Sequence, residues 1–417
     1  MTGTTPRLQV DNAFTERFER WFGGLAAIGK LPSGGYQRFA WTTEDAEAQA
    51  WFAEVAGEIG LDLETDRNGN IWAWWGTPGP GTILTGSHLD SVANGGTYDG
   101  GLGLVSGLLA VDELKRQGLQ PTRPIAVVAF ADEEGGRYNS ACFGSSLMAG
   151  VKRPEDLLGR VDVDGVSMRD ALRNFGVDPD GLGSDPERVS WIDVMVELHV
   201  EQGRGLVHHN APVGLATAIW PHGRWQIILD GEANHAGTTQ LEDRRDPALV
   251  VAGAIQAARE VAVEFESLAT IGKLSVEPNA PNAVPSRLTA ILDARCPDDQ
   301  TLALLVRRFG DRVKGLADEH GVDFGITNQS IAARVDFDEE LYAACEGSLV
   351  ARGRKVIGLP TAAGHDAGAL ASSFPTAMLF VRNVTGISHS PQEYATSEDC
   401  IEGTVVLAEI LADLACR

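Results

Sequence analysis

One histidine and two aspartates follow a short apolar run in the segment ILTGSHLDSVANGGTYDG, residues 83 to 100. Imidazole nitrogen and carboxylate oxygen together are typical ligands of zinc, manganese or cobalt. Asp99 is flanked by glycines, which let the backbone turn tightly beside an ion. Asp90, two residues after His88, is placed to accept the second ring N–H of that histidine. The segment predicts a metal centre in which Asp99 bridges two ions.

Similar groups lie near the ends of two other apolar runs. The run 125–130 leads to Glu133 and Glu134, and the run 194–200 contains His199. In open α/β sheets, ligand-binding residues gather beyond the carboxyl ends of the strands, so these groups can meet although they are far apart in the chain. Two ions that share a carboxylate can clamp a carbonyl and activate water. Each group alone is more often structural, and their joint occurrence favours the metal centre.

The remaining histidines and the absence of the usual catalytic motifs narrow the set of candidate metal ligands and of possible enzyme classes. His389 lies between serines in a polar segment, as a ligand would, whereas four others lie in loop-like or helix-end contexts and are interpreted as structural: His208, His209, His222 and His320. The chain contains no G-x-S-x-G, H-E-x-x-H or G-x-x-x-x-G-K-[ST] motif. Serine hydrolase, zincin and nucleotide-binding functions are therefore disfavoured.

Composition sets the class of protein. A chain of 417 residues with 43% hydrophobic content predicts two or three globular domains. Its formal net charge of −24 disfavours binding to nucleic acid or an anionic membrane. The five cysteines form no C-x-x-C pair, and the sequence shows neither a signal segment nor an apolar stretch long enough to span a bilayer. We therefore expect a cytoplasmic protein with reduced thiols.

The elements that must position these residues follow from periodicity. Buried strands over 71–75, 82–85, 125–130 and 194–200, with a helix over 103–116, indicate an α/β domain formed by residues 1–214 and 331–417. Between them, 215–330 has the β-α-β-β-α-β order of a ferredoxin-like unit. A strand over 377–381 and a closing helix return to the first domain, and 163–185 is expected to be a surface excursion.

The chain resembles a known family over nearly its whole length. It is similar to the metal-dependent amidohydrolases of the M20 peptidase superfamily, in the branch of N-carbamoyl-L-amino acid, allantoate, ureidoglycolate and β-ureidopropionate hydrolases. The motifs that carry the resemblance are GGYQRFAWTTED, GSHLDSVANGGTYDG, DEEGGRYNSACFGS, ELHVEQG, ANHAGTTQLEDRRD, PNAPNAVPSRLTAILDAR, AAGHDA and GISHSPQEY. The fold that this implies is a two-metal exopeptidase-like α/β domain with an inserted lid.

The resemblance also implies a ligand set. One metal would be held by His88, Asp99 and His199, and a second by Asp99, Glu134 and His389. Relatives that cut peptides usually have an acidic ligand in place of His199, so this histidine favours the carbamoyl-hydrolysing branch. The two divalent ions per subunit are zinc or, with the same ligands, manganese, cobalt or nickel.

Further site residues come from the same resemblance. Glu133 matches the general base that takes a proton from the attacking water and delivers it to the leaving nitrogen. Asp90 matches the residue that orients the first histidine ligand. Gln202 and the backbone around Gly364 match substrate contacts.

The inserted domain is expected to be both lid and dimerisation domain of a homodimer. His235, Asn282 and Arg295 match residues that contact the substrate, some of them in the neighbouring subunit's active site. An arginine can pair bidentately with a substrate carboxylate, and the other two side chains can donate to a developing oxyanion. Without the resemblance, an ion pair with Asp293 or Asp298 is the simpler interpretation of Arg295.

The expected reaction is hydrolysis of the ureido C–N bond of an N-carbamoyl-L-α-amino acid to the amino acid, CO2 and ammonia. Allantoate, ureidoglycolate or β-ureidopropionate are alternative substrates, while a peptidase, an aminoacylase or a non-catalytic binding protein is less favoured. Three departures from the family pattern leave the substrate open: Gln240-Leu241 for Pro-Met, Thr361-Ala362 for Ser-Gly, and Arg382-Asn383 for Pro-Ser.

Overall fold

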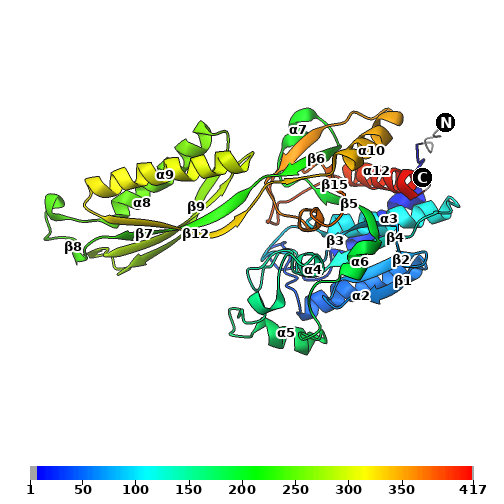
Figure 1. The fold of residues 1–417 in the computed structure, drawn as a ribbon, viewed down its shortest axis with the longest axis horizontal. Helices are drawn as coiled ribbons and strands as arrows, with labels where there is room; N and C mark the ends of the chain where they lie inside the picture. The colour runs from blue at the N-terminus through cyan, green and yellow to red at the C-terminus, as the bar shows by residue number, and fades with distance from the viewer. Residues whose placement is uncertain (1–6, 416–417) are drawn as a thin grey trace. The chain divides into compact units, whose positions relative to one another are not determined.

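The computed structural model describes residues 7–415, which form two compact units (Figure 1). Unit 1 comprises the chain up to Thr217 and from Asp336 onward, and unit 2 comprises Ala218–Val335. Each unit has its own hydrophobic core. Unit 2 is therefore an insertion within the chain of unit 1.

Unit 1 is organised around a mixed sheet. The order of its strands is β1-β2-β4-β3-β5-β15-β6-β13, with β14 paired to β6. The bounds are β1 (Asp62–Thr65), β2 (Ile71–Trp75), β3 (Thr82–His88), β4 (Ile125–Phe130), β5 (Ile192–Val200), β6 (Val213–Ile219), β13 (Val335–Asp336), β14 (Gly358–Thr361) and β15 (Thr376–Val381). The neighbours β4, β3, β5 and β15 are parallel. All residues of β3, β4 and β15 are buried, so both faces of these strands are covered, which explains the apolar sequences of β4 and β15.

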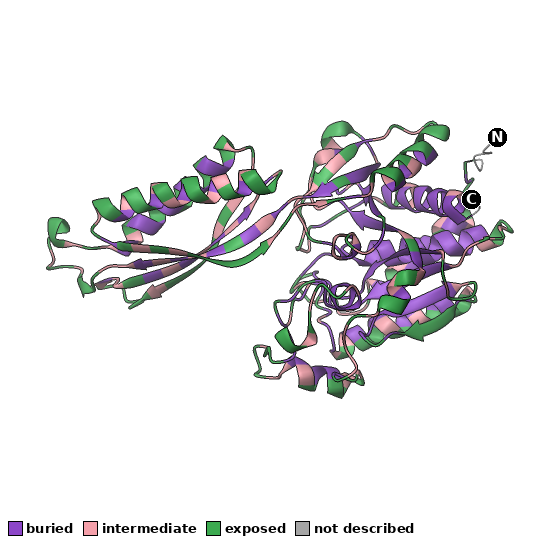
Figure 2. Cartoon of the chain, in the orientation of Figure 1, coloured by how far each residue is buried: buried purple, intermediate pink, exposed green. Residues whose placement is uncertain are grey.

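Unit 1 also contains helices, several of which pack against its sheet. They are α1 (Asn12–Leu25), α2 (Thr43–Glu58), α3 (Gly101–Arg116), α4 (Phe143–Met148), α5 (Met168–Phe175), α6 (Pro186–Trp191), α7 (Gly205–His209), α10 (Glu339–Ala351), α11 (Asp366–Leu370) and α12 (Ser397–Ala415). Residues of α1, α2, α3 and α12 share one core with the sheet, and Figure 2 shows α3 and α12 buried along most of their length. Asp11 caps α1 by accepting the Phe14 N–H at 2.9 Å.

Glycine lets α3 approach the sheet closely. A Cβ added at Gly103 would lie 2.4 Å from the carbonyl oxygen of Leu198 and 2.7 Å from the Cβ of Ser87. These residues immediately precede His199 and His88. The first turn of α3 therefore packs directly behind the ends of β5 and β3.

Unit 2 has an antiparallel sheet of order β12-β7-β11-β9. Its elements are β7 (His222–Asp230), β8 (Asn234–His235), α8 (Pro247–Glu264), β9 (Leu268–Glu277), β10 (Ala283–Val284), β11 (Arg287–Arg295), α9 (Asp299–Glu319) and β12 (Asp323–Ala332). Burial alternates along β7 and β11, because one face of the sheet packs in a core with α8 and α9.

The structure differs from two expectations. Residues 163–185 are not merely a surface excursion: they contain α5, whose Met168, Ala171 and Leu172 are buried in a separate core cluster. The strand expected at 82–85 continues to His88, so this histidine belongs to the sheet. Cys142, Cys296, Cys345 and Cys400 are buried and form no disulfide with one another, while Cys416 lies outside the described residues. Across residues 7–415, no helix combines the length and apolarity that crossing a bilayer requires.

The close approach of α3 gives a first prediction. We expect Gly103→Ala to lower the free energy of unfolding by about 1–3 kcal/mol, because the added methyl group meets backbone and not a flexible side chain. Gly57→Ala, on the exposed side of α2 with no atom within 4 Å of the added Cβ, is the control and should be neutral or slightly stabilising. Urea unfolding followed by circular dichroism measures both, and equal stability of the two variants would contradict the packing argument.

Candidate metal centre

The parallel strands bring the predicted ligands to one edge of the sheet. His88 is the last residue of β3 and pairs with Phe130, the last residue of β4. His199, the penultimate residue of β5, pairs with Phe380 of β15. Beyond these ends lie the loops that carry Asp99, Glu133 and Glu134, and His389.

A first cluster joins His88, Asp99 and His199, whose potential ligand atoms all lie within 4.8 Å of one another. Asp99 Oδ1 is 3.1 Å from His199 Nε2 and 3.4 Å from His88 Nε2. All three side chains are buried. Two nitrogens and one oxygen around a single point suit a borderline cation such as zinc.

A second cluster shares Asp99 with the first. Asp99 Oδ2 lies 3.5 Å from His389 Nε2, which is in turn 3.6 Å from Glu134 Oε1. His389 is half-exposed and has a left-handed backbone with φ of 54°, a conformation that costs a non-glycine residue energy. The two oxygens of Asp99 thus face different clusters, as a bridging ligand requires.

Hydrogen bonds fix the tautomers of the buried histidines. His88 Nδ1 lies 3.0 Å from the carbonyl oxygen of Asp90, and His199 Nδ1 lies 2.9 Å from that of Val200. A carbonyl only accepts, so in the neutral ring each Nδ1 carries the proton and each Nε2 turns its lone pair toward Asp99. Nitrogen lone pairs facing a carboxylate need a cation between them. Within residues 7–415, the buried His88 Nε2 and Glu134 Oε1 also lack hydrogen-bond partners, so the donor set fits divalent metal ions.

Asp90 differs from expectation in how it contacts His88. Its carbonyl accepts the ring N–H, while its carboxylate Oδ1 lies farther from Nδ1, at 3.6 Å. The carboxylate instead accepts the backbone N–H groups of Glu133 and Glu134, each at 3.0 Å. Asp90 therefore connects the end of β3 to the turn after β4.

Glu133 is buried beside the first cluster without belonging to it. Its Oε2 lies 3.8 Å from His88 Nε2, and its Oε1 accepts from the thiol of Cys142 at 3.4 Å. Burial, together with the charges of Asp366 and Glu134, raises the pKa of Glu133 well above its usual value, although His88 opposes the shift. The carboxylate is positioned to accept or hold a proton next to the metal ligands.

The pKa of Asp99, the carboxylate shared by the two clusters, shifts in the opposite direction from that of Glu133. Burial would raise the pKa of Asp99, but its interactions with His199 and His88, when these rings are protonated, outweigh burial and hold the pKa well below its usual range. Asp99 therefore stays ionised, which a bridging metal ligand must be.

Two of the expected substrate contacts lie in unit 1. The Nε2 of Gln202 donates to Asp99 Oδ2 at 2.9 Å and lies 3.3 Å from His389 Nε2, so this side chain borders the second cluster. Gly364 lies between β14 and α11, and a Cβ added there would meet no atom within 4 Å. A ligand can approach the backbone closely at this position.

The other three expected substrate contacts lie in unit 2. His235 is exposed on β8 and pairs with Ala283, next to Asn282. Arg295 ends β11, and its Nε lies 3.0 Å from Asp293 Oδ1. The ion pair considered for this arginine is therefore present, and the Arg295 side chain is about a third exposed.

Sequence reasoning did not assign a role to two buried neighbours of the first cluster. His365 packs edge-on against His199 at 4.4 Å between ring centroids, and Glu197 lies close enough to both to form a third group of potential ligands. Glu197 accepts from Ser87 and from the backbone N–H of Ala367. Its position two residues before His199 on the same strand face was the available signal, as was the AAGHDA motif for His365.

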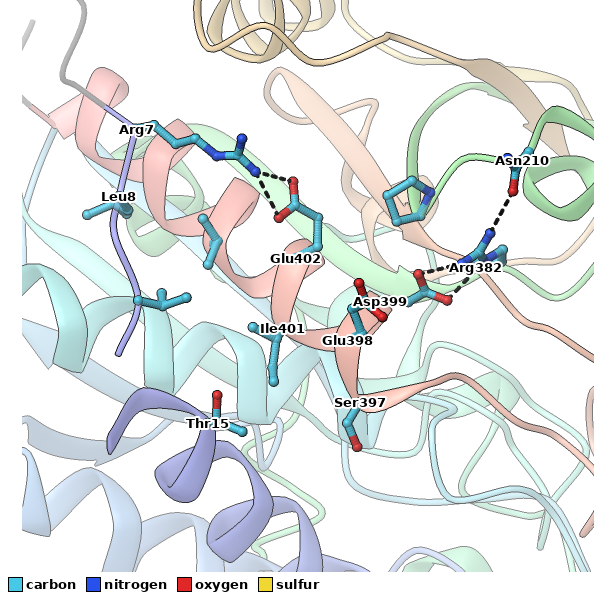
Figure 3. A pocket seen from close by; sticks show the side chains of 13 residues that line it. Arg7, Leu8, Thr15, Asn210, Arg382, Ser397, Glu398, Asp399, Ile401 and Glu402 are labelled. Atoms are coloured by element: carbon cyan, nitrogen blue, oxygen red, sulfur yellow. Dashed lines mark hydrogen bonds and ion pairs between the residues drawn. The ribbon is translucent and has the colours of Figure 1, made fainter. Parts of the chain in front are cut away.

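Arg382, one of the departures from the family pattern, is held in an ion pair. It binds both carboxylate oxygens of Asp399, at 2.8 and 2.9 Å (Figure 3). The two residues line a pocket of about 750 Å³ that shares no residue with the metal-ligand clusters. The arginine is therefore engaged by Asp399 and lies apart from the residues of the metal-ligand clusters.

Comparison with known proteins identifies the family. Residues 84–413 match the model of peptidase family M20/M25/M40, so the chain belongs to this family. Members of this family are metal-dependent. Relatives of the chain are named amidohydrolases, so the chain is a hydrolase that acts on amide bonds.

Particular relatives extend over almost the whole chain. An N-carbamoyl-L-amino acid amidohydrolase of Geobacillus stearothermophilus is 37% identical, with 94% of this chain and 96% of the relative covered. An allantoate amidohydrolase of Bacillus subtilis is 32% identical, with 98% and 99% covered. A hydantoinase/carbamoylase-family amidase of Burkholderia multivorans superposes with a TM-score of 0.87 at 30% identity, covering 99% of this chain and 100% of that one.

The hydrogen bonds of Asp90 generate a second prediction. We expect Asp90→Asn to lower zinc affinity on the order of 10- to 100-fold, because one of the two side-chain oxygens that accept the backbone N–H groups of Glu133 and Glu134 is replaced by an NH2 donor, and this turn shifts. Zinc titration of the apo protein by calorimetry provides the measurement. Asp62→Asn on exposed β1 changes the charge equally and should bind zinc like the wild type. Unchanged affinity in Asp90→Asn would refute the positioning role of this carboxylate.

Proposed function

We propose that this protein hydrolyses the ureido C–N bond of an N-carbamoyl-L-α-amino acid, releasing the amino acid, CO2 and ammonia. The observation that carries the proposal is the pair of clusters that share Asp99, with Glu133 beside them as a carboxylate outside both ligand sets. Divalent ions bound there would polarise the carbamoyl carbonyl and lower the pKa of water. Zinc, manganese, cobalt and nickel are all compatible with these ligands.

The residues of unit 1 then have distinct roles. His88, Asp99 and His199 hold one ion, and Asp99, Glu134 and His389 hold the other. Glu133 accepts the proton of the attacking water and transfers it to the leaving nitrogen, a role that suits a buried carboxyl with a raised pKa.

The expected substrate contacts have separate proposed roles. Arg295 would pair with the α-carboxylate, while His235 and Asn282 would donate to the oxyanion that forms on the carbamoyl carbon. Gln202 and the backbone at Gly364 complete the proposed contacts. We further propose that unit 2 is the lid and dimerisation domain of a cytoplasmic homodimer.

Allantoate is the second candidate substrate. It also combines ureido groups with a carboxylate, and relatives named allantoate amidohydrolases are 32% identical over at least 96% of the chain. The proposed ligands, base and arginine would serve either substrate by the same steps.

A third prediction tests the proposed base. We expect Glu133→Gln to retain both metal ions and to lose about 10²- to 10⁴-fold in kcat, because an amide cannot take up the proton. Ammonia release and bound metal are measured on the same samples. Turnover close to that of the wild type would exclude Glu133 as the base.

A substrate panel distinguishes the two candidate reactions. Ammonia release by the metal-loaded enzyme is compared for N-carbamoyl-L-amino acids, their D-enantiomers, allantoate, ureidoglycolate and β-ureidopropionate, with dipeptides followed by amine release. We expect N-carbamoyl-L-amino acids to give the highest kcat/KM. A preference for allantoate would replace the first proposal by the second, and hydrolysis of dipeptides alone would contradict both.

A further inference from the structure

Glu393 is a buried acid in the loop that follows His389, and its carboxylate connects two loops of the metal centre. Oε1 accepts the backbone N–H groups of Tyr98 and Asp99, each at 3.1 Å. Oε2 accepts the hydroxyl of Ser388 at 3.1 Å. The side chain is 4% exposed, so these hydrogen bonds form away from bulk water.

On one side, Glu393 fixes the turn that carries the bridging ligand. A Cβ added at Gly96 would lie 2.2 Å from Glu393 Oε1, so glycine is needed for the carboxylate to approach this turn. The turn ends at Gly100, whose φ is 67° and where a Cβ would lie 2.5 Å from the His88 ring. Asp99 is thus held between the Glu393 carboxylate and the His88 ring.

On the other side, Glu393 fixes the loop that carries His389. The residues on both sides of this histidine bond to Glu393: Ser388 through its hydroxyl, and Ser390 through its carbonyl, which accepts the Glu393 N–H at 3.0 Å. Because His389 is half-exposed and left-handed, its position depends on these neighbours.

We propose that Glu393 is a positioning residue that sets the distance between Asp99 and His389 and thereby the affinity of the second metal ion. This inference rests on the proposed two-metal function. The first cluster depends less on Glu393, because His88 and His199 lie on buried strands and are fixed by backbone carbonyls. Loss of the Glu393 hydrogen bonds therefore weakens the second ion more than the first.

The proposed role of Glu393 is tested by zinc titration of the apo protein. Calorimetry measures the affinity of each ion, and atomic absorption counts the bound zinc. His389→Ala identifies the signal of the second ion. In Glu393→Ala we expect second-ion affinity to fall on the order of 10- to 100-fold, while first-ion affinity stays within about threefold of the wild type. Glu393→Gln can keep all three hydrogen bonds, since its oxygen accepts both N–H groups and its amide donates to Ser388, and should restore most of the affinity.

Two further variants complete the experiment. Ser388→Ala removes one hydrogen bond without emptying the buried site, and a selective loss of second-ion affinity is expected even if Glu393→Ala fails to fold. Glu398→Ala removes an exposed acid of the same chain segment and should bind both ions normally.

The outcomes separate this inference from the proposed function. Unchanged second-ion affinity in Ser388→Ala and in any folded Glu393→Ala, or equal loss at both ions, would overturn the role of Glu393 while leaving the two-metal proposal intact. A wild-type protein that binds a single zinc ion would overturn the two-metal proposal and this inference with it. Normal two-ion binding in wild-type protein that hydrolyses no substrate of the panel would count against the proposed reaction alone.

Discussion

The carboxylate of Asp99 must stay ionised and fixed while three imidazoles face it, and much of unit 1 serves that requirement. His199, His88 and His389 lie 3.1 to 3.5 Å from its two oxygens. Glycines on either side allow the turn, α3 packs behind it through Gly103, and Glu393 binds the adjacent backbone. This one side chain belongs to both clusters.

The charge of the site explains why it needs cations. Asp90 and Glu133 are buried and Glu134 is partly buried. Each carboxylate lies 3.6 to 3.8 Å from a histidine ring nitrogen, and burial raises the pKa of each carboxyl. A group of acids in a poorly solvated place is unfavourable unless positive charge is bound among them. The same lack of water strengthens the interaction of any ion that binds there.

The sequence predicted strands better than it predicted hydrogen bonds. The apolar runs at 71–75 and 125–130 coincide with β2 and β4, because burial on both faces leaves an unbroken apolar pattern with polar ends. That His88, Glu134 and His199 lie at one edge of the sheet could be predicted, because each lies near the carboxyl end of an apolar run. The contacts of Asp90 did not, since its carbonyl and carboxylate are equally possible partners for a ring N–H. Glu393 was not selected either, because an acid in a polar loop has the same local sequence whether it is solvated or buried.

The two buried histidines obtain their tautomers from the main chain, through the carbonyls of Asp90 and Val200. Every amino acid has that carbonyl, so the orientation of the ligands does not depend on which side chain occupies position 200. Sequence drift at this position can alter packing without changing the proton that the ring carries. Substitutions at such positions therefore leave the tautomer of the histidine ligands unchanged. Relatives with about a third of their residues in common can share the same ligand geometry for this reason.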